Sequence, residues 1–352
     1  MPIGLSLYLD LVRFAAALTV FLFHLGYGKL VGNPFNMFVQ FGEPAVIVFF
    51  VLSGFVISYV RASREQTLAS FAIARLSRIY SVAIPALLLT AGFDLWGSAL
   101  NPDLYPIPLT FEALLRCLSF TNEIGGGRSS FGSAQTFWSL GWEVWYYVMF
   151  AIATFATSYV RILLLILCAA IVGINILAFF PVWLLGIACY SFCTRARINQ
   201  TIGGLVFSLP VVVFGVLVYF DAIAPIAHGL GTNRQQMILT YAIALLFSAH
   251  VIGAYALSNR LLWALRRLGG PIRWLAGTTF TLYLLHLPIA FLIRSNLPWD
   301  VGSWKSMVSI LVGTLAVSFL VAGFTEKRKD IWRRAFSVPV NGLARLASRQ
   351  VG

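Results

Sequence analysis

Charged side chains are scarce in this sequence. Only 11% of its 352 residues are Asp, Glu, Lys or Arg, whereas a soluble globular domain carries about 25%. Hydrophobic side chains make up 59% of the chain, which together with the shortage of charge excludes an ordinary soluble domain and predicts an integral membrane protein. Because each membrane span takes roughly 20 apolar residues, most of the chain is needed for spans and no separate soluble domain fits.

Cysteine is also rare, with four residues in the whole chain. Cys117, Cys168, Cys189 and Cys193 mostly lie inside apolar runs, and the close pair Cys189 and Cys193 lacks the companion ligands that a zinc site needs. We interpret the cysteines as packing residues and expect no metal. The N-terminus lacks the basic region and the clear cleavage site of a signal peptide, so we expect the first apolar stretch to be retained.

Acidic residues are outnumbered by basic ones, 12 to 25, which gives a formal net charge of +13. In a soluble protein this excess would suggest nucleic acid, but here the basic residues fall between apolar runs and after the last run, so we expect no nucleic-acid partner. With both termini cytoplasmic, 18 basic residues lie inside and 6 outside. The positive-inside rule therefore predicts cytoplasmic termini.

The apolar runs predict an all-α integral membrane protein with a bundle of about ten transmembrane helices. The fifth and sixth runs meet at Pro181 and could instead form one bent unit, which would reverse the orientation of everything downstream. We expect a transmembrane domain over 1–324 and a basic cytoplasmic tail over 325–352, a helix on the anionic inner leaflet with an anchoring role. The largest outer segment, 101–137, is either a substrate-facing lid or a plain flexible connection. The ten expected spans are 5–27, 42–60, 79–100, 138–156, 161–180, 181–194, 202–220, 235–257, 274–295 and 304–324.

The first span contains three ionisable residues in apolar company, Asp10, Arg13 and His24. Such residues are costly in a membrane and indicate a functional site. Asp10 and Arg13 are neighbours on one helix face, so an ion pair explains them in part. Arg13 and His24 are separated by nearly three whole turns, so they share a face about 16 Å apart. His24 is either a buried histidine hydrogen-bonded to a neighbouring helix or a proton-transfer residue.

Two further groups of polar residues accompany apolar helices. Glu143 lies among aromatic residues from Trp138 to Tyr147, where it needs an Arg, a His or water as a partner. Arg75 and Arg78 share a helix face and are able to grip phosphate oxygens, although retention of positive charge inside explains them as well.

Three histidines remain. For His286, in the ninth span, structural hydrogen bonding and function are equally good interpretations. His228 and His250 have no companions in sequence, and we interpret them as structural.

Taken together, five motifs in order resemble the membrane-bound acyltransferase family three, and the resemblance covers most of the chain. These are Arg13-x10-His24, the run Phe49-Phe-Val-Leu-Ser53-Gly54, Arg75-x-x-Arg78, Trp138-Ser-Leu-x-x-Glu143-x-x-Tyr146-Tyr147, and Tyr283-Leu-Leu-His286. Members of this family move an acyl group, often acetyl from acetyl-CoA, to a hydroxyl of a cell-surface glycan, lipid-linked sugar or small glycoside.

The resemblance implies a role for each matching residue. His24 and Arg13 correspond to the family's catalytic pair, Arg75 and Arg78 to its cytoplasmic grip on CoA phosphates, and Glu143 to its buried carboxylate. One departure is Ile47, because many relatives carry an acid at that position and the nearest acid here is Glu43, four positions earlier. The esterase-like domain fused to some relatives is absent, so a partner enzyme for the outer face would be a separate polypeptide.

These observations predict a multi-pass O-acyltransferase of the cell (inner) membrane. A thioester is already activated, so transfer mainly requires deprotonation of the acceptor hydroxyl. His24 is the candidate base, or alternatively a transient acyl carrier. Glu143 is expected to orient the imidazole or hold a substrate hydroxyl, and Tyr147, His286 and Trp138 are candidates for binding the substrate. The rival is a transporter or flippase with Arg13, His24 and Glu143 along a polar pathway, which the lack of an internal repeat weakens.

Overall fold

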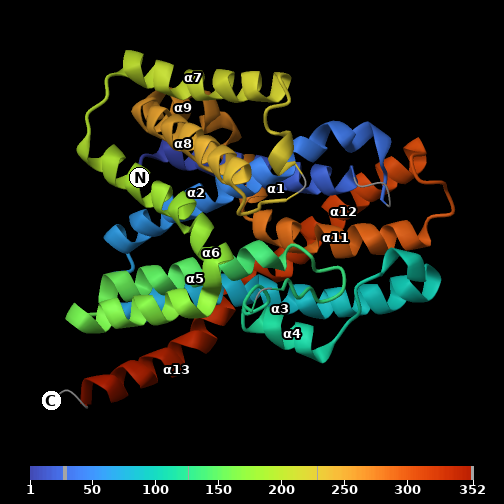
Figure 1. Cartoon of the computed structure of the whole chain (residues 1–352), viewed down its shortest axis with the longest axis horizontal. Helices are drawn as coiled ribbons and strands as arrows, with labels where there is room; N and C mark the ends of the chain where they lie inside the picture. The colour runs from blue at the N-terminus through green and yellow to red at the C-terminus, as the bar shows by residue number, and fades with distance from the viewer. Residues whose placement is uncertain (27–29, 126, 228, 350–352) are drawn as a thin grey trace. The chain divides into compact units, whose positions relative to one another are not determined.

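The computed structural model describes residues 1–26, 30–125, 127–227 and 229–349 of the chain. It is 82% helical, and no strand occurs among the described residues, as expected for an all-α protein. Figure 1 follows the helices from the N-terminus to the C-terminus. The chain divides into two compact units, which we call unit 1 (Met1–Tyr59, Ile174–Thr279 and Trp299–Met307) and unit 2 (Val60–Gly173, Phe280–Pro298 and Val308–Gly352).

Unit 1 is built around α1, the first helix of the chain. This helix packs against η1, α8, α9 and α10, whose bounds are given below. Its helices α7 and α8 lie side by side (Figure 1). The helices that belong wholly or largely to this unit are α1 (Ile3–Leu25), α2 (Gly42–Ser63), α7 (Gln200–Tyr219), α8 (Arg234–Ala256), α9 (Ser258–Leu265) and α10 (Gly269–Ala276), with short 3₁₀ helices at Asn33–Phe41 (η1), Ala224–Ile226 (η3) and Arg266–Leu268 (η4).

Unit 2 is organised along a long helix, α3 (Leu68–Leu100), against which the C-terminal helix packs. Its other elements are the short η2 (Pro102–Leu104), α4 (Phe111–Leu118), α5 (Phe137–Phe155), η5 (Glu326–Arg328) and α13 (Lys329–Arg349). Four helices contribute to both units, namely α2, whose end lies in unit 2, α6 (Ser158–Arg195), α11 (Thr279–Asn296) and α12 (Trp304–Phe324).

Close backbone packing holds α2 to the second half of α6 in unit 1. A Cβ added to Gly54 would lie 2.0 Å from the carbonyl oxygen of Trp183, and one added to Gly186 would lie 2.0 Å from that of Val51. The Trp183 indole N–H donates to the Ser53 hydroxyl at 3.1 Å. The run that ends in Ser53-Gly54 therefore has a packing role, because only glycine allows two helices to approach this closely.

The four cysteines are free and buried. Cys189 and Cys193 lie in the core of unit 1 with Leu5, Leu52 and Phe55, which agrees with their interpretation as packing residues. No group of three His, Cys, Asp or Glu side chains suited to a metal ion occurs in the described part of the chain.

Seven helices among the described residues are long and apolar enough to cross a membrane, or eight if a helix pair broken near residue 277 forms one span. The chain is therefore a multi-pass membrane protein, whereas the count of ten is not confirmed. Two expected boundaries were wrong. The helix expected from residue 79 begins at Leu68, because Thr67 and Ser70 form a capping box. The fifth and sixth runs form one bent element, α6, which is the alternative that the sequence left open, but the bend lies at Gly173 (φ 76°) and not at Pro181, since glycine adopts a positive φ without strain.

The orientation of the chain stays a prediction, and cysteine labelling tests it. Ser130→Cys in the segment 101–137 should react with an impermeant thiol reagent in intact cells, because the positive-inside rule places the preceding basic segment 61–78 inside and this segment outside. Ser63→Cys, at the exposed end of α2, should react only after lysis. The native cysteines are buried and give little background. The opposite labelling pattern would reverse the predicted topology.

Candidate functional site

The first group of site residues lies on α1 in unit 1. Arg13 Nη1 is 3.5 Å from Asp10 Oδ1, so the expected ion pair is present, with both side chains about one-fifth exposed. His24 lies eleven residues farther on, about 16 Å along the helix axis. The structure therefore places Arg13 and His24 on one helix face without direct contact between them.

The His24 ring is held by its own helix. Its Nδ1 lies 2.8 Å from the carbonyl oxygen of Val20, and because a carbonyl only accepts hydrogen bonds, Nδ1 carries the proton of the neutral ring. The other ring nitrogen, Nε2, then presents a lone pair. The Phe23 ring meets the imidazole edge-on, with centroids 4.7 Å apart. This tautomer is the one that accepts a proton at Nε2.

The first turn of α2 lies beside the last turns of α1. A Cβ on Gly42 would be 2.4 Å from the Phe23 ring, so Gly42 packs directly on the residue next to His24. The following residue, Glu43, is 8% exposed, whereas Ile47 is fully buried. Glu43 is therefore a buried carboxylate near the end of the helix that carries His24, although it lies one helical turn before the position at which relatives carry an acid.

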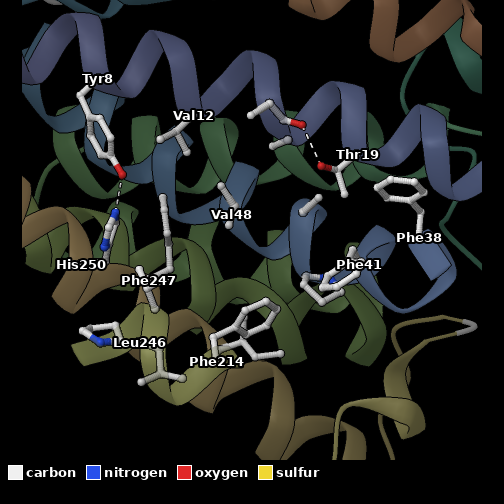
Figure 2. Close-up of a pocket in the computed structure, with 17 residues that line it drawn as sticks. Tyr8, Val12, Thr19, Phe38, Phe41, Val48, Phe214, Leu246, Phe247 and His250 are labelled. Atoms are coloured by element: carbon white, nitrogen blue, oxygen red, sulfur yellow. Dashed lines mark hydrogen bonds between the residues drawn. The ribbon is translucent and has the colours of Figure 1, made fainter. Parts of the chain in front are cut away.

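Unit 1 also contains an apolar pocket of about 410 Å³ between α1, α2, α7 and α8. Figure 2 shows Tyr8 and His250 at one end of it and Phe38 and Phe41 at the other. The His250 Nδ1–H donates to the carbonyl oxygen of Phe207 at 2.6 Å, so Nε2 accepts from the Tyr8 hydroxyl. These bonds agree with a structural role for His250, while His228 lies outside the described residues.

That pocket is separate from the Arg13 and His24 face of α1. Its α1 residues, such as Val12 and Thr19, are about a third of a turn around the helix from Arg13 and His24 at 3.6 residues per turn. The pocket therefore does not belong to the candidate proton-transfer site.

The second group of site residues lies in unit 2, on α3 and α5. Arg75 Nη2 donates to Glu65 Oε1 at 2.7 Å, and both residues are 9% exposed. The same guanidinium is 5.7 Å from the centre of the Tyr147 ring, a cation–π contact. Arg75 is therefore an internal residue with a carboxylate partner, and Glu65 was not expected from the sequence.

Arg78, one turn farther along α3, is surrounded by acidic groups. Its charge interacts with Glu143, Glu326 and Glu65 and with the Tyr147 hydroxyl. The Tyr147 hydroxyl donates to Glu143 Oε1 at 2.5 Å. The structure thus brings Arg75, Arg78, Glu143 and Tyr147 together in one polar cluster and supplies a partner for the part-buried Glu143.

Glu326 joins this cluster from the segment after α12. Its Oε2 accepts from the backbone N–H groups of Phe280 and Thr281 at 3.1 and 3.3 Å, so it caps the start of α11. Glu326 is the second residue of the expected tail, 325–352. Glu326 therefore has a structural role in unit 2 that the sequence pattern did not indicate.

The motifs on α5 and α11 contact one another directly. The hydroxyls of Ser139 and Tyr283 are 2.6 Å apart. His286 is fully buried one turn beyond Tyr283, and its Nδ1 lies 3.0 Å from the Leu282 carbonyl oxygen, which gives its ring the same tautomer as His24. Both the structural and the functional interpretation of His286 fit this arrangement.

Trp138, at the start of α5, belongs to a second cluster formed with the segment 101–137. The Arg128 guanidinium lies 4.8 Å from the centre of the Trp138 ring, and its Nε is 3.3 Å from Glu123 Oε1. Burial raises the pKa of the Glu123 carboxyl above its ordinary value, and the charge of Arg128 offsets part of that shift. An aromatic face beside an arginine and a carboxylate suits a polar substrate with hydroxyl groups.

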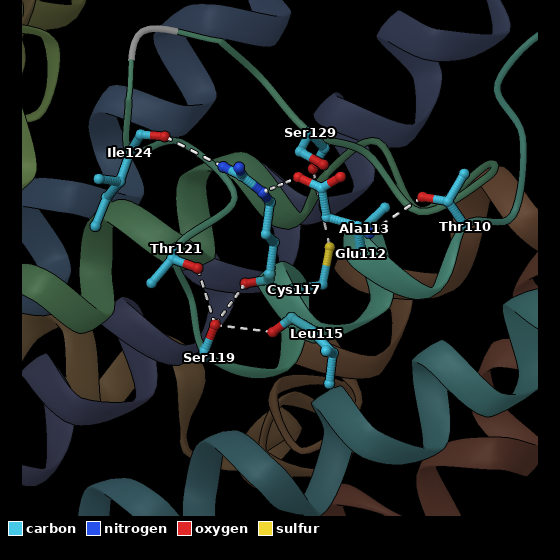
Figure 3. Close-up of polar contacts among 10 residues, drawn as sticks. Thr110, Glu112, Ala113, Leu115, Cys117, Ser119, Thr121, Ile124 and Ser129 are labelled. Atoms are coloured by element: carbon cyan, nitrogen blue, oxygen red, sulfur yellow. Dashed lines mark hydrogen bonds and ion pairs between the residues drawn. The ribbon is translucent and has the colours of Figure 1, made fainter.

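Polar contacts organise the rest of the segment 101–137, so it is more than a plain connection. Figure 3 shows the network around α4, in which the Ser119 hydroxyl contacts the Thr121 hydroxyl at 2.9 Å and the Leu115 carbonyl at 2.8 Å. Asp94 of α3 accepts from the backbone N–H of Ser133 at 2.7 Å. Burial raises the pKa of the Cys117 thiol to about 11, so this thiol is a poor nucleophile.

The residues missed by the sequence analysis are partners of residues that it found. Glu65 lies ten residues before Arg75, Arg128 ten residues before Trp138, and Glu326 far from Arg78 in the chain. For Glu65 and Glu326 the only signal was charge, since an arginine inside an apolar helix requires an acidic partner. No local spacing identified which acid that partner is.

Comparison with protein families finds a match to the model described as an acyltransferase domain, over residues 6–323. Neither the curated proteins nor the solved structures contain a significant match to the chain. The family match covers all five motifs, from Arg13 to His286, and ends just before α13. The chain therefore belongs to the acyltransferase 3 family and is a membrane acyltransferase.

Proposed function

We propose that this protein transfers an acetyl or related acyl group from cytoplasmic acyl-CoA to a hydroxyl of a glycan or glycoside, in the cell (inner) membrane. The tautomer of His24 is the observation that carries the proposal. A hydrogen bond from Nδ1 to the Val20 carbonyl leaves Nε2 as the basic nitrogen of a part-buried ring, which is what a general base needs.

In the reaction, the acyl-CoA supplies an activated thioester. His24 Nε2 takes the proton of the acceptor hydroxyl, the hydroxyl oxygen forms a bond to the thioester carbonyl carbon, and the carbon–sulfur bond breaks to release CoA. The proton on His24 then passes to the departing thiolate. Arg13, paired with Asp10, lies about 16 Å along the axis from His24, too far to contact the reacting carbonyl, and adds positive charge to the same helix face.

The cluster in unit 2 supplies the remaining roles. Arg78 is the better of the two arginines for a CoA phosphate, because Arg75 is already paired with Glu65. Arg75 instead positions Tyr147, whose ring it contacts. Glu143 and Tyr147 hold each other by a hydrogen bond and fit a substrate hydroxyl. Trp138 and His286 are further candidates for binding the substrate.

Two measurements on the parent protein test the function. Cells that contain the protein should carry O-acetyl groups on a surface glycan that cells without it lack, and the purified protein should bind acetyl-CoA. Acyl-CoA binding separates the proposal from a transporter, which has no use for a CoA donor. A protein that neither binds acetyl-CoA nor changes glycan acylation would contradict the proposed function.

A further inference from the structure

A polar groove of about 570 Å³ lies in unit 2 between the beginning of α3 and the C-terminal helix α13. It is lined by Thr67 and Ser70 of the α3 capping box and by Arg333, Arg334 and Ser337 of α13. Aromatic packing holds the two helices together beside it, since the Phe336 ring lies 5.6 Å from that of Tyr80 and 6.2 Å from that of Trp332.

The groove carries positive charge that the protein itself does not neutralise. Arg333 and Arg334 are exposed, and none of the described residues forms an ion pair or hydrogen bond with either guanidinium. Asp330 also lines the groove, which leaves a net charge of one positive unit. The N-terminal end of the 33-residue helix α3 adds the positive end of its dipole. Guanidinium groups beside hydroxyls and a helix N-terminus favour a phosphate ligand.

The groove is distinct from the cluster around Arg78 and Glu143. Ile73 and Tyr80 on its side of α3 are about 140–160° around the helix from Arg75 and Arg78 at 3.6 residues per turn. The phosphates expected where a basic, partly aromatic helix meets the end of an apolar span are those of membrane lipids.

We propose that this groove binds the phosphate of one anionic phospholipid headgroup, with Arg333 and Arg334 as its ligands. The site makes α13 a specific lipid-binding element rather than a general electrostatic anchor. It does not depend on the proposed transferase activity.

The test is a titration of the purified full-length protein with phosphatidylglycerol and with phosphatidylcholine, followed by native mass spectrometry. Arg333→Gln with Arg334→Gln should weaken phosphatidylglycerol binding by about ten- to thirtyfold, from the contribution expected of two basic residues. Arg266→Gln with Arg267→Gln is the matched control, because this exposed arginine pair lies in η4 of unit 1. The control should bind the lipid as the parent does. Phosphatidylcholine binding should be similar in all three proteins.

A second variant, Ala69→Phe, fills the groove without changing its charge and should also weaken phosphatidylglycerol binding. If the arginine variant is unstable, Ala69→Phe alone tests whether the groove binds phosphatidylglycerol. Parent-like lipid binding by both groove variants would overturn the proposal, and so would an equal loss in the control pair. Displacement of the lipid by acetyl-CoA, with a loss of acetyl-CoA affinity in the arginine variant, would instead assign the groove to the acyl donor.

Discussion

His24→Ala is expected to abolish acyl transfer, with a fall in rate of about 10²- to 10⁴-fold, the usual contribution of a positioned acid–base group. Alanine removes Nε2 and with it the acceptor for the hydroxyl proton. It costs little in an apolar helix, because alanine is both apolar and a good helix former. The measurement is transfer of labelled acetyl from acetyl-CoA to the glycan acceptor by membranes that contain equal amounts of parent or variant protein.

His24→Gln is the matched variant for this experiment. Its side-chain amide is still able to donate to the Val20 carbonyl, as the His24 Nδ1–H does, but it has no basic nitrogen. If His24 acts as a base, His24→Gln should keep the parent's thermal stability and acetyl-CoA affinity while it loses transfer. Transfer within a few-fold of the parent would exclude this role, and a trapped acyl-imidazole in the parent would favour the acyl-carrier alternative.

Local apolar runs predicted several helices well. The spans expected at 42–60, 202–220 and 304–324 correspond to α2, α7 and α12 with small shifts, because the length of an apolar run determines the length of a spanning helix. The start of α3 was missed because the span was expected to begin with the apolar run, after Arg75 and Arg78. A capping box at Thr67 and a carboxylate partner for Arg75 allow the helix to begin before these charges.

The candidate site was predictable only where spacing along one helix determines contact. Asp10 with Arg13, and Glu143 with Tyr147, are three and four residues apart, and both pairs interact in the structure. Contacts between distant segments, such as Ser139 with Tyr283, depend on how helices pack. A single sequence does not contain that information in a periodic pattern.

The second large effect is expected on the stability of the protein, and it comes from the pairing of Arg75 with Glu65. Arg75→Gln is expected to lower the free energy of unfolding by about 3–5 kcal/mol, because it leaves a buried carboxylate without its partner. Both residues are only 9% exposed, so water cannot replace the guanidinium. The measurement is thermal unfolding of the detergent-purified protein. Glu112→Gln is the matched control, since the Glu112–Arg116 pair is exposed and should contribute no more than about 1 kcal/mol.

The double variant Glu65→Gln with Arg75→Gln separates the stability of this pair from donor binding. Two neutral amides remove the unpaired charge, so most of the lost stability should return. If Arg75 positions its neighbours and Arg78 contacts the CoA phosphates, the double variant should bind acetyl-CoA with parent-like affinity. Arg78→Gln should then lose about 1.5–3 kcal/mol of binding free energy, the value of one charge-assisted contact. A double variant that is stable and yet loses the same binding free energy as Arg78→Gln would show that Arg75 contacts the donor, and that its pairing with Glu65 opens when CoA binds.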